Sequence, residues 1–233
     1  MKRIVYDIFV DMAEQPHLLI AGATGSGKSV IVNGIITTLL QLKQPSEAQF
    51  ILIDPKRVEL SPYRKLPHTI KYASEPQDML NALRYAMQIC DTRYKTMQKR
   101  GERKYSGGDV YVIIDEWADL MTTQRREVAP LIQRLAQVGR ASKVHVILCT
   151  QTPIAKVIPT EIKCNFDSRV GLRTRSAQDS RNIIGKTGLE MLPAYGQGVY
   201  MKPTGDTLYY IPYITDEAQQ EMIAHWTKRR WFL

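Results

Sequence analysis

The sequence predicts an α/β protein with a mostly parallel central sheet flanked by helices. A glycine-rich segment joins an early apolar run to a helical stretch. Further along the chain, helical stretches alternate with short apolar runs, as they do when parallel strands are joined through helices. These runs are β-branched and apolar almost throughout, which is typical of strands buried on both faces of a sheet. They lie at 50–54, 110–115, 144–150 and 168–172.

The glycine-rich segment, GATGSGKS, begins at Gly22. It fits the P-loop template G-x-x-x-x-G-K-[ST] at every fixed position. Its context agrees, because residues 18–21 predict a short buried strand before it and residues 30–40 a mostly apolar helix after it. The glycines allow backbone N–H groups to converge, and the helix adds the positive end of its dipole. This arrangement suits a polyphosphate.

A P-loop implies a definite set of contacts to ATP. Lys28 is expected to reach the β- and γ-phosphates, and the Ser29 hydroxyl is expected to hold Mg²⁺. The alternative is a glycine-rich turn that binds nothing. The residues expected to contact the nucleotide are Gly22, Ala23, Thr24, Gly25, Ser26, Gly27, Lys28 and Ser29.

Polar side chains follow two of the other predicted strands. The run 110–115 ends in an acidic pair, in which Asp115 is expected to support Mg²⁺ and Glu116 to polarise a water for attack on the γ-phosphate. The run 144–150 leads into Gln151, at the end of a strand where open α/β sheets bind ligands. Gln151 is therefore a candidate for sensing the γ-phosphate or orienting the attacking water. A solvated strand end and a capping glutamine are the alternatives for these positions.

The remaining elements complete a single predicted domain, 1–233. A long helix is expected over 76–100, with an apolar face opposite a basic one, and a second helix over 125–140, where Pro130 introduces a kink. A hairpin is expected over 197–214, followed by a closing helix at the C-terminus. The predicted apolar face of the long helix contains Met79, Leu83, Ala86, Met87, Cys90, Tyr94 and Met97, and the basic face contains Arg84, Arg93, Lys95 and Lys99.

Composition narrows the class of protein. The chain has 233 residues, a formal charge of +9 and a pI of about 9.4, which favour an anionic partner such as nucleic acid or else a merely basic enzyme. The three cysteines have no metal-binding spacing and predict small core residues in a reducing compartment. No apolar run is long enough to span a membrane, and the N-terminus lacks a signal-peptide core. We therefore expect a cytoplasmic protein.

Several longer blocks go beyond generic P-loop motifs. PHLLIAGATGSGKSVIVNGI, ILIDPKRVEL, LPH, IIDEWADLM, LIQRLAQVGRASKVHVILCTQTP and DSRNIIG occur in the order and spacing of the FtsK/SpoIIIE motor domain. The chain resembles that family from about residue 16 to residue 200. Members are bacterial translocases of double-stranded DNA.

The resemblance implies a RecA-like core and a ring of six subunits with duplex DNA in the middle. ATP would lie between neighbours, with Lys28, Ser29, Asp115 and Glu116 from one subunit and an arginine finger from the next. The position that matches the finger is Arg140, and its planar cation suits the charge of the transition state. Arg134 is the second candidate. A salt-bridged arginine near a helix end is the alternative for both.

The resemblance also implies DNA contacts, at Lys163 and Arg181. Two positions depart from the family pattern, because Thr152 and Ala177 stand where an arginine and a lysine are expected. Neighbouring cations are expected to compensate, since phosphate contacts depend more on charge than on an exact residue. They are Lys156, Arg173 and Arg175. Little sequence specificity is expected, and a solvated basic face or a contact to an acidic protein remains the alternative.

The family's membrane region, its additional domain before the motor and its winged-helix module are not recognisable here. The expectation is a bare motor or a piece of a longer one. The leading function is an ATP-driven translocase on duplex DNA. A related motor that moves protein is the second possibility, and a nucleotide-gated DNA-binding module that does not move is the third.

Overall fold

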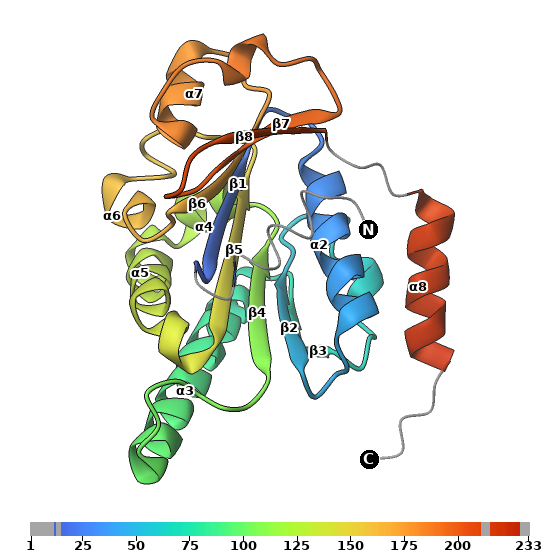
Figure 1. Ribbon diagram of the computed structural model, residues 1–233, viewed down its shortest axis with the longest axis vertical. Coiled ribbons are helices and arrows are strands. Elements are labelled where there is room, and N and C mark those ends of the chain that lie inside the picture. The colour runs from blue at the N-terminus through green and yellow to red at the C-terminus, as the bar shows by residue number, and fades with distance from the viewer. Residues whose placement is uncertain (1–11, 13–14, 211–214, 229–233) are drawn as a thin grey trace.

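The computed structural model describes residues 12, 15–210 and 215–228, and within them the strands form one eight-stranded sheet (Figure 1). The strand order is β3-β2-β4-β5-β1-β6-β7-β8. The first six strands pair in parallel, and β7 and β8 add an antiparallel hairpin at one edge. Their bounds are β1 His17–Ala21, β2 Ala48–Ile53, β3 Thr69–Ala73, β4 Asp109–Ile114, β5 Val144–Thr150, β6 Ser168–Leu172, β7 Gln197–Met201 and β8 Thr207–Tyr210.

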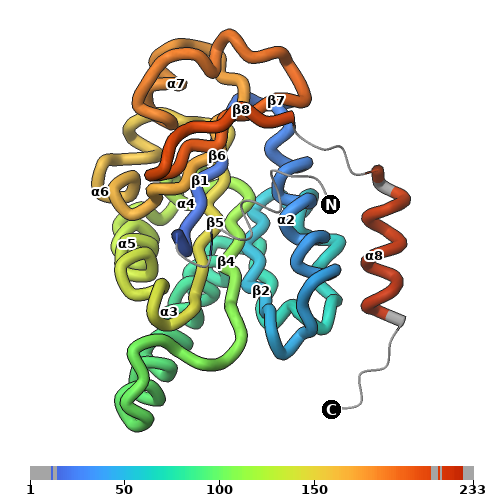
Figure 2. Tube along the Cα trace, in the orientation of Figure 1, coloured from blue at the N-terminus to red at the C-terminus, as the bar shows by residue number. Residues whose placement is uncertain are grey.

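Helices cover both faces of this sheet, as the predicted α/β class requires (Figure 1). One face packs mainly against α3, α4 and α5, and the other against α2 and α8. Figure 2 traces β1 through the middle of the sheet between β5 and β6. The helix bounds are α2 Lys28–Leu42, α3 Pro76–Arg100, α4 Trp117–Thr123, α5 Arg125–Ser142, α6 Thr160–Lys163, α7 Ala177–Ile184 and α8 Asp216–Lys228.

The apolar strands explain the two cores. Side chains alternate between the faces of a strand, so Leu18 and Ile20 of β1 pack in the cluster beneath α2, whereas Leu19 and Ala21 pack in the cluster beneath α4 and α5. All four are buried. Such strands must be apolar throughout, which is why their sequence pattern is continuous.

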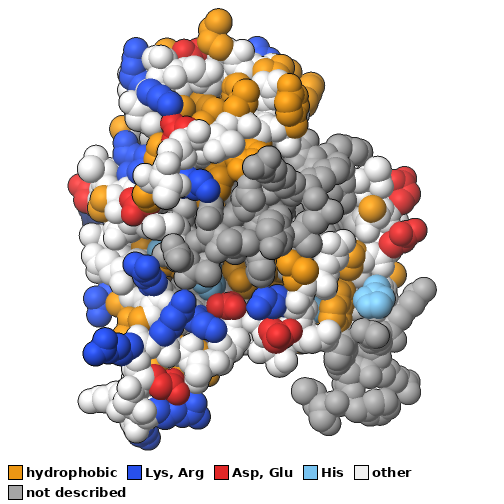
Figure 3. Space-filling view, viewed as in Figure 1, with side chains coloured by type: hydrophobic (Ala, Val, Ile, Leu, Met, Phe, Trp, Pro, Cys, Tyr) orange, Lys and Arg blue, Asp and Glu red, His pale blue; other side chains and the backbone are white. Residues whose placement is uncertain are grey.

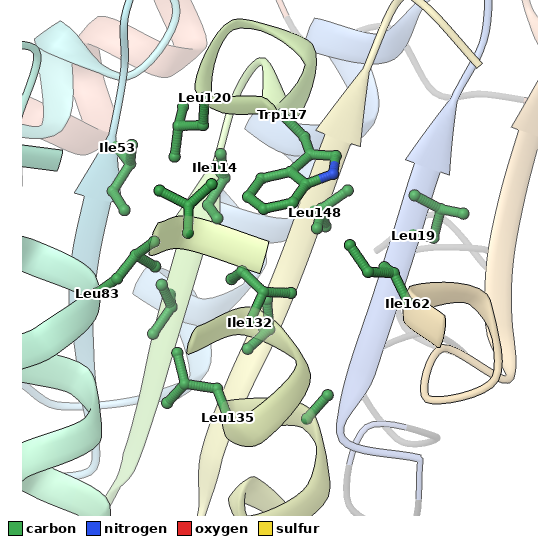
Figure 4. Close-up of a cluster of buried hydrophobic side chains, with 14 of the residues drawn as sticks. Leu19, Ile53, Leu83, Ile114, Trp117, Leu120, Ile132, Leu135, Leu148 and Ile162 are labelled. Carbon is green, nitrogen blue, oxygen red and sulfur yellow. The ribbon is translucent and has the colours of Figure 1, made fainter. Parts of the chain in front are cut away.

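Figure 4 shows part of the second of these clusters, in which the ring of Trp117 lies near Ile114 and Leu148. The indole Nε1 of Trp117 also donates to the carbonyl of Val157 at 2.8 Å. This anchor holds the start of α4 against the sheet, directly after Glu116.

The predicted strands and the two long helices are confirmed to within two residues at each end. The segments β3, α4, α6 and α7 were not predicted, because each is short and lacks a full period of its apolar pattern. Pro130 does not end the predicted helix, since α5 continues through it to Ser142. The predicted hairpin is confirmed by β7 and β8, and α8 confirms the closing helix. Residues 211–214 and 229–233 of these two predictions lie outside the described residues.

One residue on the predicted basic face of α3 is misplaced. Arg93 is buried, and its Nη1 donates to the carbonyls of Ser142 and Lys143 at 2.7 and 3.0 Å. Its guanidinium also lies 4.4 Å from the centre of the Tyr105 ring. The arginine therefore satisfies carbonyls at the end of α5, a role that depends on the packing of two helices and not on the periodicity of one.

Lys and Arg side chains gather on the side of the molecule formed by α3 and α5 (Figure 3). Those exposed at this end of the two helices are Lys95, Lys99, Arg100 and Arg140. Within the described part of the chain, no helix is both long enough and apolar enough to cross a membrane.

Candidate nucleotide site

The P-loop leaves β1 at the carboxyl edge of the sheet and turns directly into α2. Gly27 is the N-cap of α2 and has a φ of 98°, a left-handed conformation that favours glycine. Gly22 has no room for a side chain, because a Cβ there would lie 2.6 Å from the Cβ of Leu172 on β6. Packing against β6 thus holds the start of the loop, and the loop presents its N–H groups at the start of a helix.

Lys28 lies at the centre of the site. It is 4% exposed, and its Nζ contacts Oδ1 and the backbone oxygen of Asp115 at 2.5 and 2.9 Å. Burial acts to lower the pKa of Lys28, but nearby groups, among them Asp115 and Glu116, outweigh burial and raise it. The thiol of Cys149 behind the lysine stays neutral, because burial raises its pKa. The ammonium group is therefore charged and ready to contact phosphate.

Oxygen atoms that could bind a divalent cation adjoin Lys28, on Asp115, which contacts its Nζ, and on the next residue, Ser29. Oδ2 of Asp115 is one of the described side-chain oxygens that are buried without a hydrogen-bond partner. The Ser29 hydroxyl donates to Oε1 of Glu59 at 2.6 Å. Hydroxyl and carboxylate oxygens of this kind suit Mg²⁺, which takes one or two carboxylates and completes its shell with water and phosphate. The donor set therefore fits the ion that the P-loop implies.

Glu116 is held by four neighbours. Its carboxylate accepts from the Thr150 hydroxyl at 2.7 Å, from the Gln151 N–H at 3.1 Å and from the Ala118 N–H at 3.3 Å. Lys56 Nζ lies 3.4 Å from its Oε2. These contacts fix the carboxylate at the edge of the sheet that carries the P-loop, which is the position a base for an attacking water requires.

Gln151 contacts the P-loop directly. Its Oε1 accepts a 2.9 Å hydrogen bond from the Thr24 hydroxyl, while its backbone donates to Glu116. A pocket of about 490 Å³ connects these elements, a size typical of small-molecule sites. It is lined by Ala23, Gly25, Gly27, Lys28, Ser29, Val30, Gln151, Tyr195 and Gly196. The structure thus brings together the P-loop, the acidic pair and Gln151.

Three residues at this site were not predicted from the sequence to belong to it. Lys56 and Glu59 follow β2, so the rule that ligands bind beyond the carboxyl ends of strands was the signal that pointed to them. Tyr195 has no such signal, since it follows no predicted strand and belongs to no motif. Only the fold brings it to the P-loop.

Arg140 lies away from this edge. It is exposed in the last turn of α5, which leads through Lys143 into the beginning of β5. Gln151 stands beyond the other end of that strand, so seven residues at about 3.3 Å each put roughly 20 Å between the two ends. Arg140 therefore lies outside the candidate nucleotide pocket of this chain. Arg134 is also exposed on α5 and lines a groove with Asp91, Tyr94 and Lys95 of α3.

The five candidate DNA contacts fall into two groups. Arg173 and Arg175 line a hollow with Thr24 and Gly25 of the P-loop. The backbone oxygen of Arg173 also accepts from the Ala23 N–H at 2.8 Å, which ties this segment to the nucleotide site.

Of the other three candidates, Lys156 and Arg181 lie on segments that adjoin Arg175. Lys156 is exposed, Lys163 ends α6 and Arg181 is exposed on α7. A smaller hollow of about 140 Å³ brings Arg175 together with Thr152 and with Asp179 on α7. Thr152 and Ala177 are the two positions that depart from the family pattern. The segments that contain them are therefore side by side.

Comparisons with known proteins agree with this geometry. The model of the FtsK/SpoIIIE family matches residues 6–111 and 106–155. The DNA translocase FtsK of Rhizobium meliloti is 34% identical over 94% of this chain and 30% of its own length. The chain spans about a third of the length of the curated relatives it matches.

Two solved structures share the fold. The pCW3 conjugation coupling protein TcpA, solved with ATPγS, superposes with a TM-score of 0.80 and 24% identity over 92% of this chain and 66% of that one. The cytoplasmic domain of the type VII secretion ATPase EccC of Thermomonospora curvata gives a TM-score of 0.80 and 20% identity over 92% of this chain and 28% of that one.

Proposed function

Because the chain belongs to the FtsK/SpoIIIE family, we propose that it is the motor of an ATP-driven translocase on double-stranded DNA. We further propose that residues 1–233 form one motor domain. The observation that carries the proposal is the meeting of the P-loop, Asp115, Glu116 and Gln151 at the carboxyl edge of the sheet, beside a pocket that the P-loop and Gln151 line.

The chemistry of the site supports ATP hydrolysis. The P-loop N–H groups and Lys28 would bind the phosphates, while Ser29 and Asp115 would hold Mg²⁺, which would supply charge neutralisation to the triphosphate. Glu116 accepts a proton from the attacking water, and Gln151 orients that water or senses the γ-phosphate. Lys28 exchanges its bond to Asp115 for contacts to the phosphates as ATP binds.

The placement of Arg140 supports a ring. The length of β5, roughly 20 Å, separates the end of α5 that carries Arg140 from the pocket edge of the same chain, which is further than an arginine side chain extends, so Arg140 would act only on the γ-phosphate of a neighbour. We therefore assign Arg140 as the finger in a homo-oligomer, expected to be hexameric. The exposed Arg134 is the second candidate for that role.

Basic residues on neighbouring segments support DNA as the cargo. Lys156, Lys163 and Arg181 are proposed to contact backbone phosphates and so to bind duplex DNA largely without regard to sequence. Arg173 and Arg175 are proposed to join them. Because both adjoin the P-loop, a DNA contact there links the cargo to the nucleotide.

A polypeptide cargo is the second candidate function. It is favoured by the likeness to a secretion ATPase and by Thr152 and Ala177, which remove two cations from the proposed DNA surface. The deciding experiment measures the ATPase rate of the chain with and without linear duplex DNA, over a salt series, with Lys28→Ala as the background. Stimulation by DNA that falls as salt rises supports the translocase. An unchanged rate with DNA at every salt concentration contradicts it.

A further inference from the structure

Tyr195 is an exposed aromatic residue beside a phosphate-binding loop. It lies between β6 and β7, and its side chain is 73% exposed. A Cβ built on Gly25 would lie 3.8 Å from both Cε1 and the hydroxyl oxygen of Tyr195, so the ring stands next to the tip of the P-loop. This exposed ring borders the pocket that is proposed to bind ATP.

The residues that line the pocket differ in their chemistry. Gln151, whose backbone N–H donates to Glu116, is the residue at which we expect the γ-phosphate to react. Lys28 and Ser29 are proposed to contact the phosphates and Mg²⁺. Val30, Tyr195 and Gly196 also line the pocket and add to it an apolar side chain, an aromatic ring and bare backbone.

ATP has a similar division, with a reactive triphosphate and an aromatic base. Once the P-loop has bound the phosphates with the γ-phosphate toward Gln151, the sugar and base must leave in the other direction. A base has an apolar π-face, and such faces stack on aromatic side chains. Gly196 leaves room for it, because a Cβ there would meet no heavy atom within 4 Å among the described residues.

We propose that Tyr195 is the platform on which the base of the bound nucleotide stacks. This inference rests on the nucleotide site proposed above and adds the residue that recognises the nucleoside. Stacking acts on the face of the base and not on its edge, so Tyr195 contributes to the binding of ATP and GTP alike.

The test compares ligands with and without a base. Binding of ATPγS, GTPγS and inorganic tripolyphosphate, each with Mg²⁺, is measured by calorimetry on the whole chain. Tyr195→Ala should weaken the binding of both nucleotides by about ten- to a hundredfold, as loss of one stacked aromatic side chain does elsewhere. The affinity for tripolyphosphate should not change. Tyr195→Phe should bind all three ligands as the parent does, because the ring is retained.

A second variant reports the stacking without any enzymatic reaction. In Tyr195→Trp, ATPγS should change the fluorescence of the new indole, and tripolyphosphate should not. The matched control is Tyr210→Ala, which removes a tyrosine that is 78% exposed on β8 and does not line the pocket. This variant should bind every ligand as the parent does.

Two results would overturn the assignment. Equal ATPγS affinity in Tyr195→Ala and the parent shows that the ring makes no contact with the base. An equal loss of affinity for ATPγS and for tripolyphosphate in Tyr195→Ala shows that the ring acts on the P-loop itself. Failure of the site as a whole looks different, because Lys28→Ala would then leave tripolyphosphate binding intact.

Discussion

The ammonium nitrogen of Lys28 lies 2.5 Å from Oδ1 of Asp115, so the cation of the P-loop and the acid after β4 neutralise each other inside the protein. Both side chains are almost fully buried. Removing one partner of such a pair leaves an unpaired buried charge, which costs about 3–5 kcal/mol of folding free energy. The two residues are therefore expected to be coupled in stability as well as in the proposed nucleotide binding.

We expect Lys28→Ala to abolish ATP hydrolysis and also to lower the free energy of unfolding at neutral pH. The double variant Lys28→Ala with Asp115→Asn should recover much of that stability, because no buried charge remains, and should stay inactive. Urea denaturation and ATPase rates measure the two effects separately. If the double variant is no more stable than Lys28→Ala, the buried charge of Asp115 is not what destabilises the single variant.

Glu116→Gln should retain ATP binding and lose about a hundredfold or more in hydrolysis rate, since the amide cannot accept a proton from water. An amide oxygen at the position of Oε1 can still accept from Thr150 and Gln151, so the fold should be preserved. The matched control is Glu75→Gln, a change of the same kind at an exposed carboxylate that pairs with Arg57. A Glu116→Gln enzyme that hydrolyses ATP at the parental rate would show that Glu116 is not the base.

The proposed DNA surface is tested by Lys163→Ala combined with Arg181→Ala. Affinity for linear duplexes should fall equally for all sequences, and the slope of log affinity against log salt should flatten by about one unit per lost phosphate contact. The matched pair is Lys99→Ala with Arg100→Ala, which removes two exposed cations from the end of α3. If only that pair weakens binding and flattens the slope, the DNA lies along α3 and the assignment of Lys163 and Arg181 is wrong.

The assignment of Arg140 predicts complementation between subunits. Arg140→Ala and Glu116→Ala should each be nearly inactive, and loss of a finger elsewhere costs about a thousandfold or more. Mixing the two under conditions in which rings exchange subunits creates interfaces with an intact Glu116 and an intact Arg140, so part of the ATPase activity should return.

An arginine acting within its own subunit gives no rescue, because every mixed site still carries one lesion. Arg134→Ala mixed with Glu116→Ala serves as the comparison. Rescue by that pair, with none from Arg140→Ala, would transfer the finger to Arg134. Hydrolysis is the quantity to follow, since mixed rings can hydrolyse ATP without moving DNA.

The buried side chain of His17 should make the free energy of unfolding depend on pH. Burial, with the neighbouring His145, lowers its pKa to about 3, and its Nδ1 accepts a 3.1 Å hydrogen bond from the Val146 N–H. In the unfolded chain His17 binds a proton near pH 6.5, whereas in the folded state it does so only near pH 3. The folded state therefore loses stability as pH falls from about 6.5 toward 3.

The loss due to His17 amounts to about 2 kcal/mol between pH 7 and pH 5. In His17→Asn this contribution is absent, and a plot of unfolding free energy against pH should be flatter by that amount over the same interval. The slope is the readout, whatever the variant costs at pH 7. Identical slopes in the parent and the variant would mean that His17 takes up its proton in the folded state as readily as in the unfolded chain.

The sequence by itself determined the elements whose cause is local. The P-loop depends on glycines and a lysine within eight consecutive residues, the strands depend on continuous apolar runs, and the long helix depends on a repeating apolar face. The acidic pair could be assigned because it follows a buried strand immediately. The family resemblance rested on the same contiguous blocks, and the family match confirmed it.

Only the tertiary structure decided which distant segments meet. The buried role of Arg93 depends on the end of α5, which lies about fifty residues further along the chain. The bond between Ser29 and Glu59, and the place of Tyr195 beside Gly25, likewise join residues that no local pattern relates. The physical reason is that strand order, with β1 between β5 and β6, sets these encounters, and strand order follows from the packing of the whole chain and not from any one stretch of it.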